Sequence, residues 1–363
     1  MHQIPSSSKG ALAALRRVLN SPGLAQARAS WRGYAMIGIV LASLGLGYAT
    51  LAGAFSRRLT PAVLVDRQQG ATPHAGFRRA HAKGICVEGV FLSSGRLAPY
   101  VTTPMFGEGE TPFVGRFSIG GNNPTAPDLK AGVRSLALDF RLANGERWRT
   151  AMNINPVLAV RDVEAFYAQL GALAPDPATG RPSAARLAAF FDAHPESQPF
   201  LAWQRAYVPT ASFATESYHG INAFLLTDAS GRQRAVRWSA LPLAAPGENR
   251  YDDADALQAE LRDRLAKGPV RFALEFTLAD AGDVVHDPST PWPATRERVR
   301  AGVIEVRAAT PQADGPCNGI NFDPLVLPSG MAPSADPILH ARSAAYAESQ
   351  RRRATEVARE ALR

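Results

Sequence analysis

Three residues near the end of the chain have the types and spacing needed for metal coordination by a phenolate. Arg342 and Tyr346 are four residues apart, and Arg353 follows seven residues later. At 3.6 residues per turn these spacings put the three side chains on one face of a helix. A phenol titrates near pH 10 and is a poor ligand at neutral pH unless a cation stabilises its ionised form. A guanidinium one turn away supplies that cation, because it keeps its own proton.

The segment that precedes these residues is typical of a helix start. A loop rich in proline and glycine ends in Ser334-Ala-Asp-Pro337, and little in the next 25 residues would break a helix. Ser334 is the expected cap. An isolated Arg/Tyr pair on such a helix is more often a feature of an amphipathic surface than a metal site. The interpretation therefore depends on what else the chain carries.

Three further segments carry residues that are suited to acid–base chemistry and anion binding. Arg78-Arg-Ala-His81-Ala-Lys-Gly84 comes first, followed by Arg116-Phe-Ser118 and then by Asn153-Ile-Asn-Pro156 with Arg161-Asp162 after it. With the C-terminal helix, these motifs resemble the heme catalase family. They occur in the family's order along residues 76–353, and the length resembles that of its small single-domain branch, the catalase-related peroxidases. None of these motifs alone is specific for the family, but the occurrence of all of them in the family's order is specific.

The resemblance implies a role for each of these residues around a heme b. Tyr346 would be the proximal iron ligand, as tyrosine is in catalases, with Arg342 sustaining the phenolate. On the distal side His81 would be the acid/base, Asn153 would orient the peroxide, and Ser118 would hold the imidazole by a hydrogen bond. The ring of Phe166 would pack against the heme. The guanidinium groups that would bind its propionates are those of Arg78, Arg116 and Arg353.

The same resemblance predicts a peroxidase that reduces hydrogen peroxide or organic hydroperoxides with a small organic donor, with weak catalase activity at most. Val157, Leu158 and Ala159 stand where the large catalases place aromatic residues, which favours a wider channel. Two alternatives stay open. One is an enzyme of this fold that rearranges lipid hydroperoxides, and the other is a non-catalytic heme-binding module. A homo-oligomer is compatible with the resemblance.

Charge and composition exclude some other classes of protein. A hydrophobic content of 46% allows a packed core. The net charge of +8 would fit a nucleic-acid-binding protein, but the basic residues gather at the two ends, and no acidic residue precedes Asp66. We therefore expect no nucleic-acid partner. Glycine-rich phosphate loops and zinc-ligand motifs are also missing from the sequence.

An uncharged apolar run from Tyr34 to Phe55 is long enough to cross a bilayer as one helix. The basic residues before it place the N-terminus in the cytoplasm by the positive-inside rule. The rest of the chain would then be outside the cytoplasm, on the periplasmic side. A cleaved export signal is the alternative, because Ala49–Ala54 offers small residues to a peptidase.

The chain has two cysteines, Cys86 and Cys317, without metal-ligand spacing. The default expectation is one buried thiol near the first strand and one thiol in a loop, although an exported domain would permit a disulfide. The sequence leaves their pairing open.

The pattern of strands and helices predicts an α+β fold, which the resemblance sharpens to a closed antiparallel β-barrel with surrounding helices. The expected domains are a basic cytoplasmic arm (1–33), a transmembrane anchor (34–55), a tether (56–72) and a heme domain (73–363). Strands are expected at Ile85–Phe91, Val114–Ile119, Ser135–Leu142, Trp148–Asn153, Ala223–Thr227, Gln233–Trp238, Val270–Leu278 and Val303–Ala308. Helices are expected at Val163–Leu173, Ser183–Ala193 and Asp252–Ala266, besides the helix after Ser334.

Overall fold

The structure is a computed structural model that describes residues 33–45 and 59–362. Residues 33–45 are helical and exposed. Within these described ranges no helix is both long and apolar enough to cross a membrane. The expected transmembrane helix over 34–55 is therefore not found there, and its second half, like the basic arm up to residue 32, lies outside the described residues.

Leu59–Arg363 forms one compact unit built on antiparallel strands. The strands are β1 (Gly84–Ser93), β2 (Gly109–Ile119), β3 (Arg134–Arg141), β4 (Arg147–Asn153), β5 (Tyr218–His219), β6 (Phe224–Thr227), β7 (Gln233–Pro242), β8 (Val270–Leu278), β9 (Arg298–Pro311) and β10 (Met331–Pro333). The helices of this unit are α3 (Pro61–Gln69), α4 (Val163–Ala172), α5 (Ala184–Ala193), α6 (Gln198–Ala206), α7 (Ala256–Leu265) and α8 (Pro337–Ala361).

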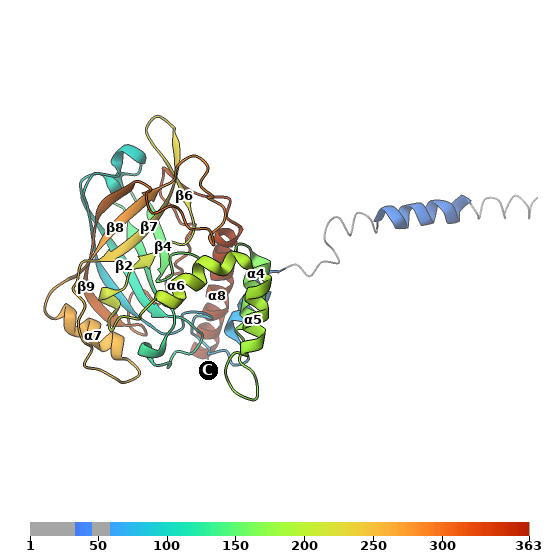
Figure 1. Cartoon of the computed structure of the whole chain (residues 1–363), viewed down its shortest axis with the longest axis horizontal. Helices are drawn as coiled ribbons and strands as arrows, with labels where there is room; N and C mark the ends of the chain where they lie inside the picture. The colour runs from blue at the N-terminus through green and yellow to red at the C-terminus, as the bar shows by residue number, and fades with distance from the viewer. Residues whose placement is uncertain (1–32, 46–58, 363) are drawn as a thin grey trace, which may run out of the picture. The chain divides into compact units, whose positions relative to one another are not determined.

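Eight of these strands, within residues 59–362, close into a barrel in the order β1-β2-β3-β4-β5-β7-β8-β9, and β9 pairs back with β1 (Figure 1). Strand β6 adds to β7 outside the ring, and β10 adds to β6. The hairpin between β3 and β4 turns at Gly145, whose φ of 85° suits glycine. The expected closed antiparallel barrel with surrounding helices is confirmed.

The barrel interior is filled by large side chains from alternate strand positions. On β2 Phe113 and Phe117 point inward, and on β3 Leu136, Leu138 and Phe140 do so. Aromatic rings interlock there: Phe140 stacks on Trp148 at 4.9 Å between centroids, and Trp148 meets Trp238 edge-on at 5.1 Å. Because side chains alternate along a strand, the positions between these residues face outward.

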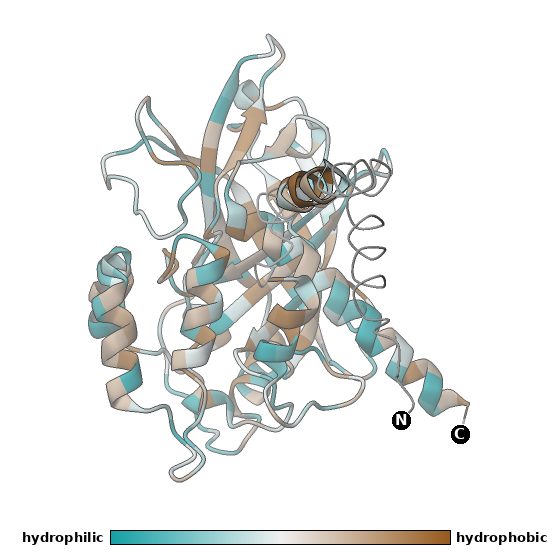
Figure 2. Ribbon diagram, turned by 90° about the vertical axis from the view of Figure 1, so that its right-hand side faces the viewer, coloured by the Kyte–Doolittle hydropathy of each residue, from teal (hydrophilic) through white to brown (hydrophobic). Residues whose placement is uncertain are grey.

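The long helix α8 lies beside the barrel, next to α3 and α4 (Figure 1). It carries both hydrophilic and hydrophobic residues along its length (Figure 2). Its cap is Asp336, whose carboxylate accepts from Ile338 N at 2.8 Å and Leu339 N at 3.4 Å. The prediction of Ser334 as the cap is wrong, because Pro337 already occupies the first helical position.

Residues 59–72, which sequence analysis assigned to a tether, belong to the compact unit. They form α3, which begins at Pro61 after the cap Thr60 and packs against α8. Thr60 Oγ1 accepts from Val63 N at 3.3 Å. A buried leucine and valine, Leu64 and Val65, fix this helix to the unit.

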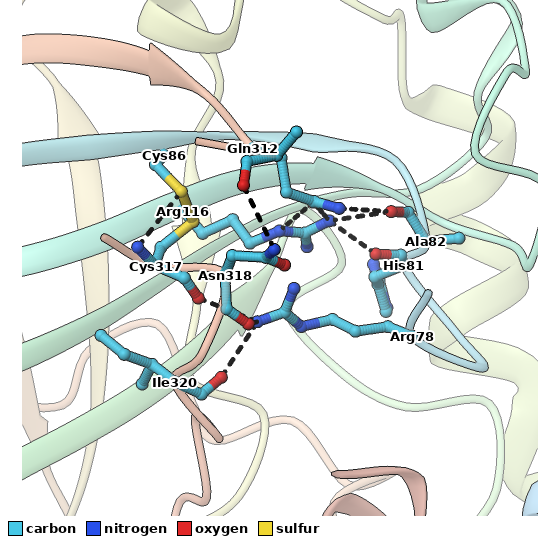
Figure 3. The surroundings of a disulfide bond; sticks show 10 residues. Arg78, His81, Ala82, Cys86, Arg116, Gln312, Cys317, Asn318 and Ile320 are labelled. Carbon is cyan, nitrogen blue, oxygen red and sulfur yellow. Dashed lines mark hydrogen bonds between the residues drawn. A yellow bond between two sulfur atoms is a disulfide. The ribbon is translucent and has the colours of Figure 1, made fainter. Parts of the chain in front are cut away.

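The two cysteines form a disulfide, Cys86–Cys317, which joins β1 to the loop after β9 (Figure 3). The expectation of two free thiols is therefore wrong. The pairing depends on how the chain folds back across 231 residues, which neither local sequence nor spacing reveals.

Candidate active site

A cavity of about 260 Å³ lies outside the barrel, between its strands and the helices. All nine residues predicted for the site line it, although they come from five segments of the chain. These residues are Arg78, His81, Arg116, Ser118, Asn153, Phe166, Arg342, Tyr346 and Arg353.

The barrel supplies one wall through the outward positions of three neighbouring strands. Their registers align Ser118 with Ser135 and Ser135 with Asn153, while Arg116 and Ala151 both align with Ala137. The strand period of two thus collects polar groups on the outer face while aromatic rings fill the interior. This alternation is why a packed barrel can present a reactive surface.

The α8 wall is held by a chain of hydrogen bonds that sequence analysis did not find. Arg342 donates to Asn222 Oδ1 at 2.5 Å and to the Ala151 carbonyl at 3.0 Å, and its Nη2 lies 3.4 Å from the Tyr346 hydroxyl. Asn222 in turn donates to Asp336 Oδ2 at 2.7 Å. The helix cap is therefore also the anchor of the arginine beside Tyr346.

His81 is the only non-glycine residue among those described that has a positive φ, at 53°. The left-handed region costs a residue with a Cβ about 1–2 kcal/mol. Neighbouring contacts hold this conformation: Arg116 Nη2 donates to the His81 carbonyl at 2.7 Å, and Ala82 N donates to Gly121 O at 3.0 Å. A strained backbone that is fixed in this way is common at functional sites.

The hydroxyl next to the imidazole is that of Ser135. Its Oγ lies 3.3 Å from His81 Nδ1 and donates to Asn153 Oδ1 at 2.5 Å. Ser118 was predicted for this contact, and in the described structure it lines the cavity without a hydrogen bond to the ring. Ser118 and Ser135 are direct cross-strand neighbours, so the contact that the resemblance implied for Ser118 is made in this structure from the adjacent strand.

Burial lowers the pKa of His81 from 6.5 to about 4, and the positive charge of Arg116 is the largest further cause. The imidazole is therefore neutral at neutral pH and able to accept a proton. Ser135 lies beside one ring nitrogen, and His81 is among the residues that line the cavity. The arrangement suits a general base.

The cavity is strongly cationic. It is lined by four arginines and, among the described residues, by no aspartate or glutamate. Burial, and next the positive charge of Arg353, lower the pKa of Arg116 to about 9. Burial also lowers the pKa of Arg78, well below its usual value. Buried cations without carboxylates are costly, which points to an anionic occupant.

Arg78 marks where such an anion fits. Its Nη2 donates to three carbonyls, whereas its Nη1 is buried without any partner in the described structure. An orphaned guanidinium nitrogen beside Arg116 and Arg353 is ready for a charge-assisted bond to a carboxylate. A heme brings two propionates, an apolar ring for Phe166 and Leu64, and an iron for the phenol. The residues present therefore fit a heme.

Sequence analysis missed several residues that line the cavity, among them Leu64, Gln68, Ser135 and Asn222, and it missed Asp336, which holds Asn222. Ser135 had a usable signal, since it is a polar residue at an outward position of an apolar strand. Asp336 stands inside the recognised helix start. Asn222 and the α3 residues carried no signal, because only the tertiary fold brings them to the cavity.

Comparison with known proteins gives a consistent result. Residues 74–268 match the family model named Catalase. A catalase-related peroxidase of Synechococcus elongatus is 36% identical over 332 residues, covering 89% of this chain and 97% of that protein. Another, from Mycolicibacterium paratuberculosis, is 32% identical and covers 80% of this chain and 94% of that protein.

Among solved structures, the crystal structure of a fungal catalase superposes with a TM-score of 0.68 at 19% sequence identity. The match covers 77% of this chain and 60% of the fungal protein. At this identity the likeness concerns the fold alone.

Proposed function

The chain belongs to the catalase family of heme enzymes, and we propose that it is a heme b peroxidase that reduces hydrogen peroxide or organic hydroperoxides with a small organic donor. The observation that carries the proposal is the single cationic cavity. It brings Tyr346 and Arg342 together with His81 and Asn153. Arg78 also lines it, and one of its guanidinium nitrogens, Nη1, is buried without a partner in the described structure.

On one side of the cavity we assign Tyr346 as the iron ligand. Arg342 lies close enough to stabilise a phenolate, and Asn222 and the Ala151 carbonyl fix its orientation. A bound heme supplies the iron on which peroxide is reduced. Arg78, Arg116 and Arg353 would hold its propionates by charge-assisted hydrogen bonds.

On the other side His81 is the proton carrier. As a neutral base it would take the proton from one peroxide oxygen and return it to the other, which makes that oxygen ready to leave as water. The two electrons that cleavage of the O–O bond needs would come from the bound heme. Ser135 orients the imidazole and ties it to Asn153. That tie holds the amide of Asn153 where it can donate to a bound peroxide.

Donor oxidation is favoured over peroxide disproportionation by side chains that line the cavity. Leu158 lines the cavity at a segment where large catalases carry aromatic residues, and α3 contributes Leu64 and Gln68. A wall of aliphatic residues and a glutamine leaves room for an organic molecule. Each peroxide reduced to two waters takes two electrons and two protons, which two donor molecules supply one at a time.

The test supplies the heme-loaded protein with hydrogen peroxide, with and without a phenol or aromatic amine, while oxygen and oxidised donor are measured. We expect two donor molecules to be oxidised per peroxide, with little oxygen released. One oxygen per two peroxides without donor consumption would identify a catalase. A rearranged lipid hydroperoxide with the donor untouched would favour the rearranging enzyme. A lack of turnover with bound heme would favour a binding module.

The pH dependence of the reaction follows from the pKa of His81. The active imidazole is neutral, and the pKa of the ring is lowered to about 4. The kcat/KM for peroxide should therefore be constant from pH 8 down to about 5 and be halved near pH 4. Heme absorbance recorded at each pH separates this effect from acid unfolding. A half-loss near pH 6.5 would contradict the assignment, because it would match an unshifted histidine.

We also propose that the compact unit works outside the cytoplasm. The basic residues before the apolar run support this orientation, and so does the Cys86–Cys317 disulfide, since cytosolic thiols are kept reduced. A reporter that is active only in the cytoplasm should stay silent when fused after Arg363. The same reporter fused after Gly33 is the matched control and should be active. Activity of the fusion after Arg363 would reverse the proposal.

A further inference from the structure

The Cys86–Cys317 disulfide lies among the groups that hold two of the cavity arginines (Figure 3). Cys86 is on the outward face of β1, directly opposite Arg116 in the β1–β2 register. Both cysteines are fully buried. The bond is therefore next to the site and part of its packing.

Cys317 belongs to the arginine loop, which we define as residues 312–322 between β9 and α8. Its backbone hydrogen bonds are local turns: Asp314 N to Pro311 O, Asn318 N to Gly315 O, and Ile320 N to Cys317 O. Apart from the turn at Pro311, the last residue of β9, none of its backbone groups in the described structure pairs with the backbone of a strand. Beyond its peptide bond to β9, the disulfide attaches the loop covalently to the barrel, and Cys317 N also donates to Cys86 Sγ at 3.2 Å.

The arginine loop holds Arg78. The guanidinium Nη2 donates to the carbonyls of Cys317 at 3.0 Å, Asn318 at 3.3 Å and Ile320 at 2.9 Å. These are all the hydrogen bonds that Arg78 makes among the described residues, and its Nη1 is buried there without a partner. The orientation of the Arg78 guanidinium group thus depends on where the loop places these three carbonyl groups.

The same loop also supports Arg116. Gln312 Oε1 accepts from Arg116 Nε at 2.7 Å, and Gln312 Nε2 donates to the Ala82 carbonyl at 3.1 Å. Through Arg116 this contact reaches the carbonyl of His81. Arg353, in contrast, lies on α8 and bonds to Gln350 of its own helix. Its link to the loop is indirect, through the 3.4 Å hydrogen bond from Gln350 Nε2 to the Gly319 carbonyl, and none of the loop groups bonds to Arg353 itself among the described residues.

Gly315 shows how closely the loop lies on the disulfide. A Cβ at this position would be 2.5 Å from Cys86 Sγ and 2.9 Å from the Pro311 carbonyl. Contacts this short exclude any side chain unless the loop moves. The sulfur bridge and the loop therefore form one packed unit, and a change in either displaces the carbonyls that hold Arg78.

We propose that the Cys86–Cys317 disulfide is a positioning element for cofactor binding: it fixes the arginine loop, and through the loop it aims Arg78 at an acidic group of the heme. This inference rests on the proposed function, because it concerns the same cavity. The buried arginines repel one another, so Arg78 would turn away from the cavity if the loop carbonyls were released. Heme would then lose a charge-assisted contact and dissociate faster.

The test is a double-mutant cycle on heme dissociation from the full-length protein, followed by transfer of heme to excess apomyoglobin. Replacing both cysteines (Cys86→Ala with Cys317→Ala) should speed heme loss about tenfold, the effect of one charge-assisted bond. In the Arg78→Gln background the same replacement should change the rate less than about twofold, because the arginine through which it acts is gone. In the matched Arg353→Gln background the full tenfold effect should remain.

A purely structural disulfide would speed heme loss by the same factor in all three backgrounds, and that result overturns the proposal. No effect of cysteine removal in the parent background overturns it as well. If the cysteine variant does not fold, Gly315→Ala displaces the loop with both cysteines present and should show the same dependence on Arg78. Failure of the parent protein to bind heme at all would instead refute the proposed function.

Discussion

Replacement of His81 by asparagine is expected to slow peroxide consumption by ~10²–10⁴-fold, the contribution typical of a positioned general acid–base. Heme content should stay near that of the parent protein, because the His81 side chain is neither the proposed iron ligand nor one of the arginines that would bind the propionates. Asparagine is the informative substitution, since it tolerates the left-handed backbone of this position and carries no group that titrates near neutrality. Stopped-flow measurement of peroxide loss, with heme quantified on the same samples, gives both numbers.

His81→Ala provides the comparison for backbone effects. It should lose activity to the same extent as His81→Asn, but it should also lose stability, because alanine gains nothing from a positive φ. Asn153→Ala should be milder, since it removes an orienting hydrogen bond and no proton carrier. His340→Ala, at an exposed position of α8, is the control for a histidine outside the cavity. Parent-like rates in both His81 variants would show that the base is elsewhere.

The second large effect is expected from Tyr346→Phe, which removes the proposed iron ligand and leaves the ring. Partners that only orient a ligand typically contribute 10–100-fold to metal affinity, so loss of the ligand itself should weaken heme binding by at least ~100-fold. The absorption spectrum of any heme that remains should change, because its iron has lost the phenolate. Heme titration of the apoprotein and the visible spectrum measure both outcomes.

Tyr100→Phe is the matched control for this substitution. The Tyr100 hydroxyl donates to Glu297 at 2.8 Å, away from the cavity, so its loss should leave heme binding unchanged. Arg342→Leu should weaken heme binding more than Tyr100→Phe and less than Tyr346→Phe, because it removes the cation beside the phenol and keeps the proposed ligand. An unaltered spectrum and unaltered heme affinity in Tyr346→Phe would remove Tyr346 from the site.

The alternation of inward and outward residues along the strands is visible in the sequence, although the site residues themselves were expected only through the resemblance. The two-residue period separates Phe117 from Arg116 and Ser118, and it does so without knowledge of neighbouring strands. Such periodicity tells which face a residue is on, but not which of two adjacent strands lies closer to a ligand. Ser118 was expected beside the imidazole only through the resemblance of Arg116-Phe-Ser118, whereas Ser135 makes the contact.

Other features depended on long-range geometry and could not be derived. The disulfide, the role of Asn222 and the packing of α3 on α8 all join segments that are remote in sequence. Barrel closure was expected only through the resemblance, since local pattern shows strands without their partners. The left-handed backbone of His81 has no signature either, because histidine is an ordinary residue for an extended loop.

The spread of the site along the chain has a consequence for biosynthesis. His81 precedes β1, whose closing partner is β9, while Tyr346 lies on α8 after every strand of the barrel. A nascent chain therefore exposes its proton carrier long before either the barrel or the iron ligand exists. Because domains fold as units during and after synthesis, cofactor capture has to be a late event. A ribosome-bound chain that is arrested before α8 should be unable to retain heme.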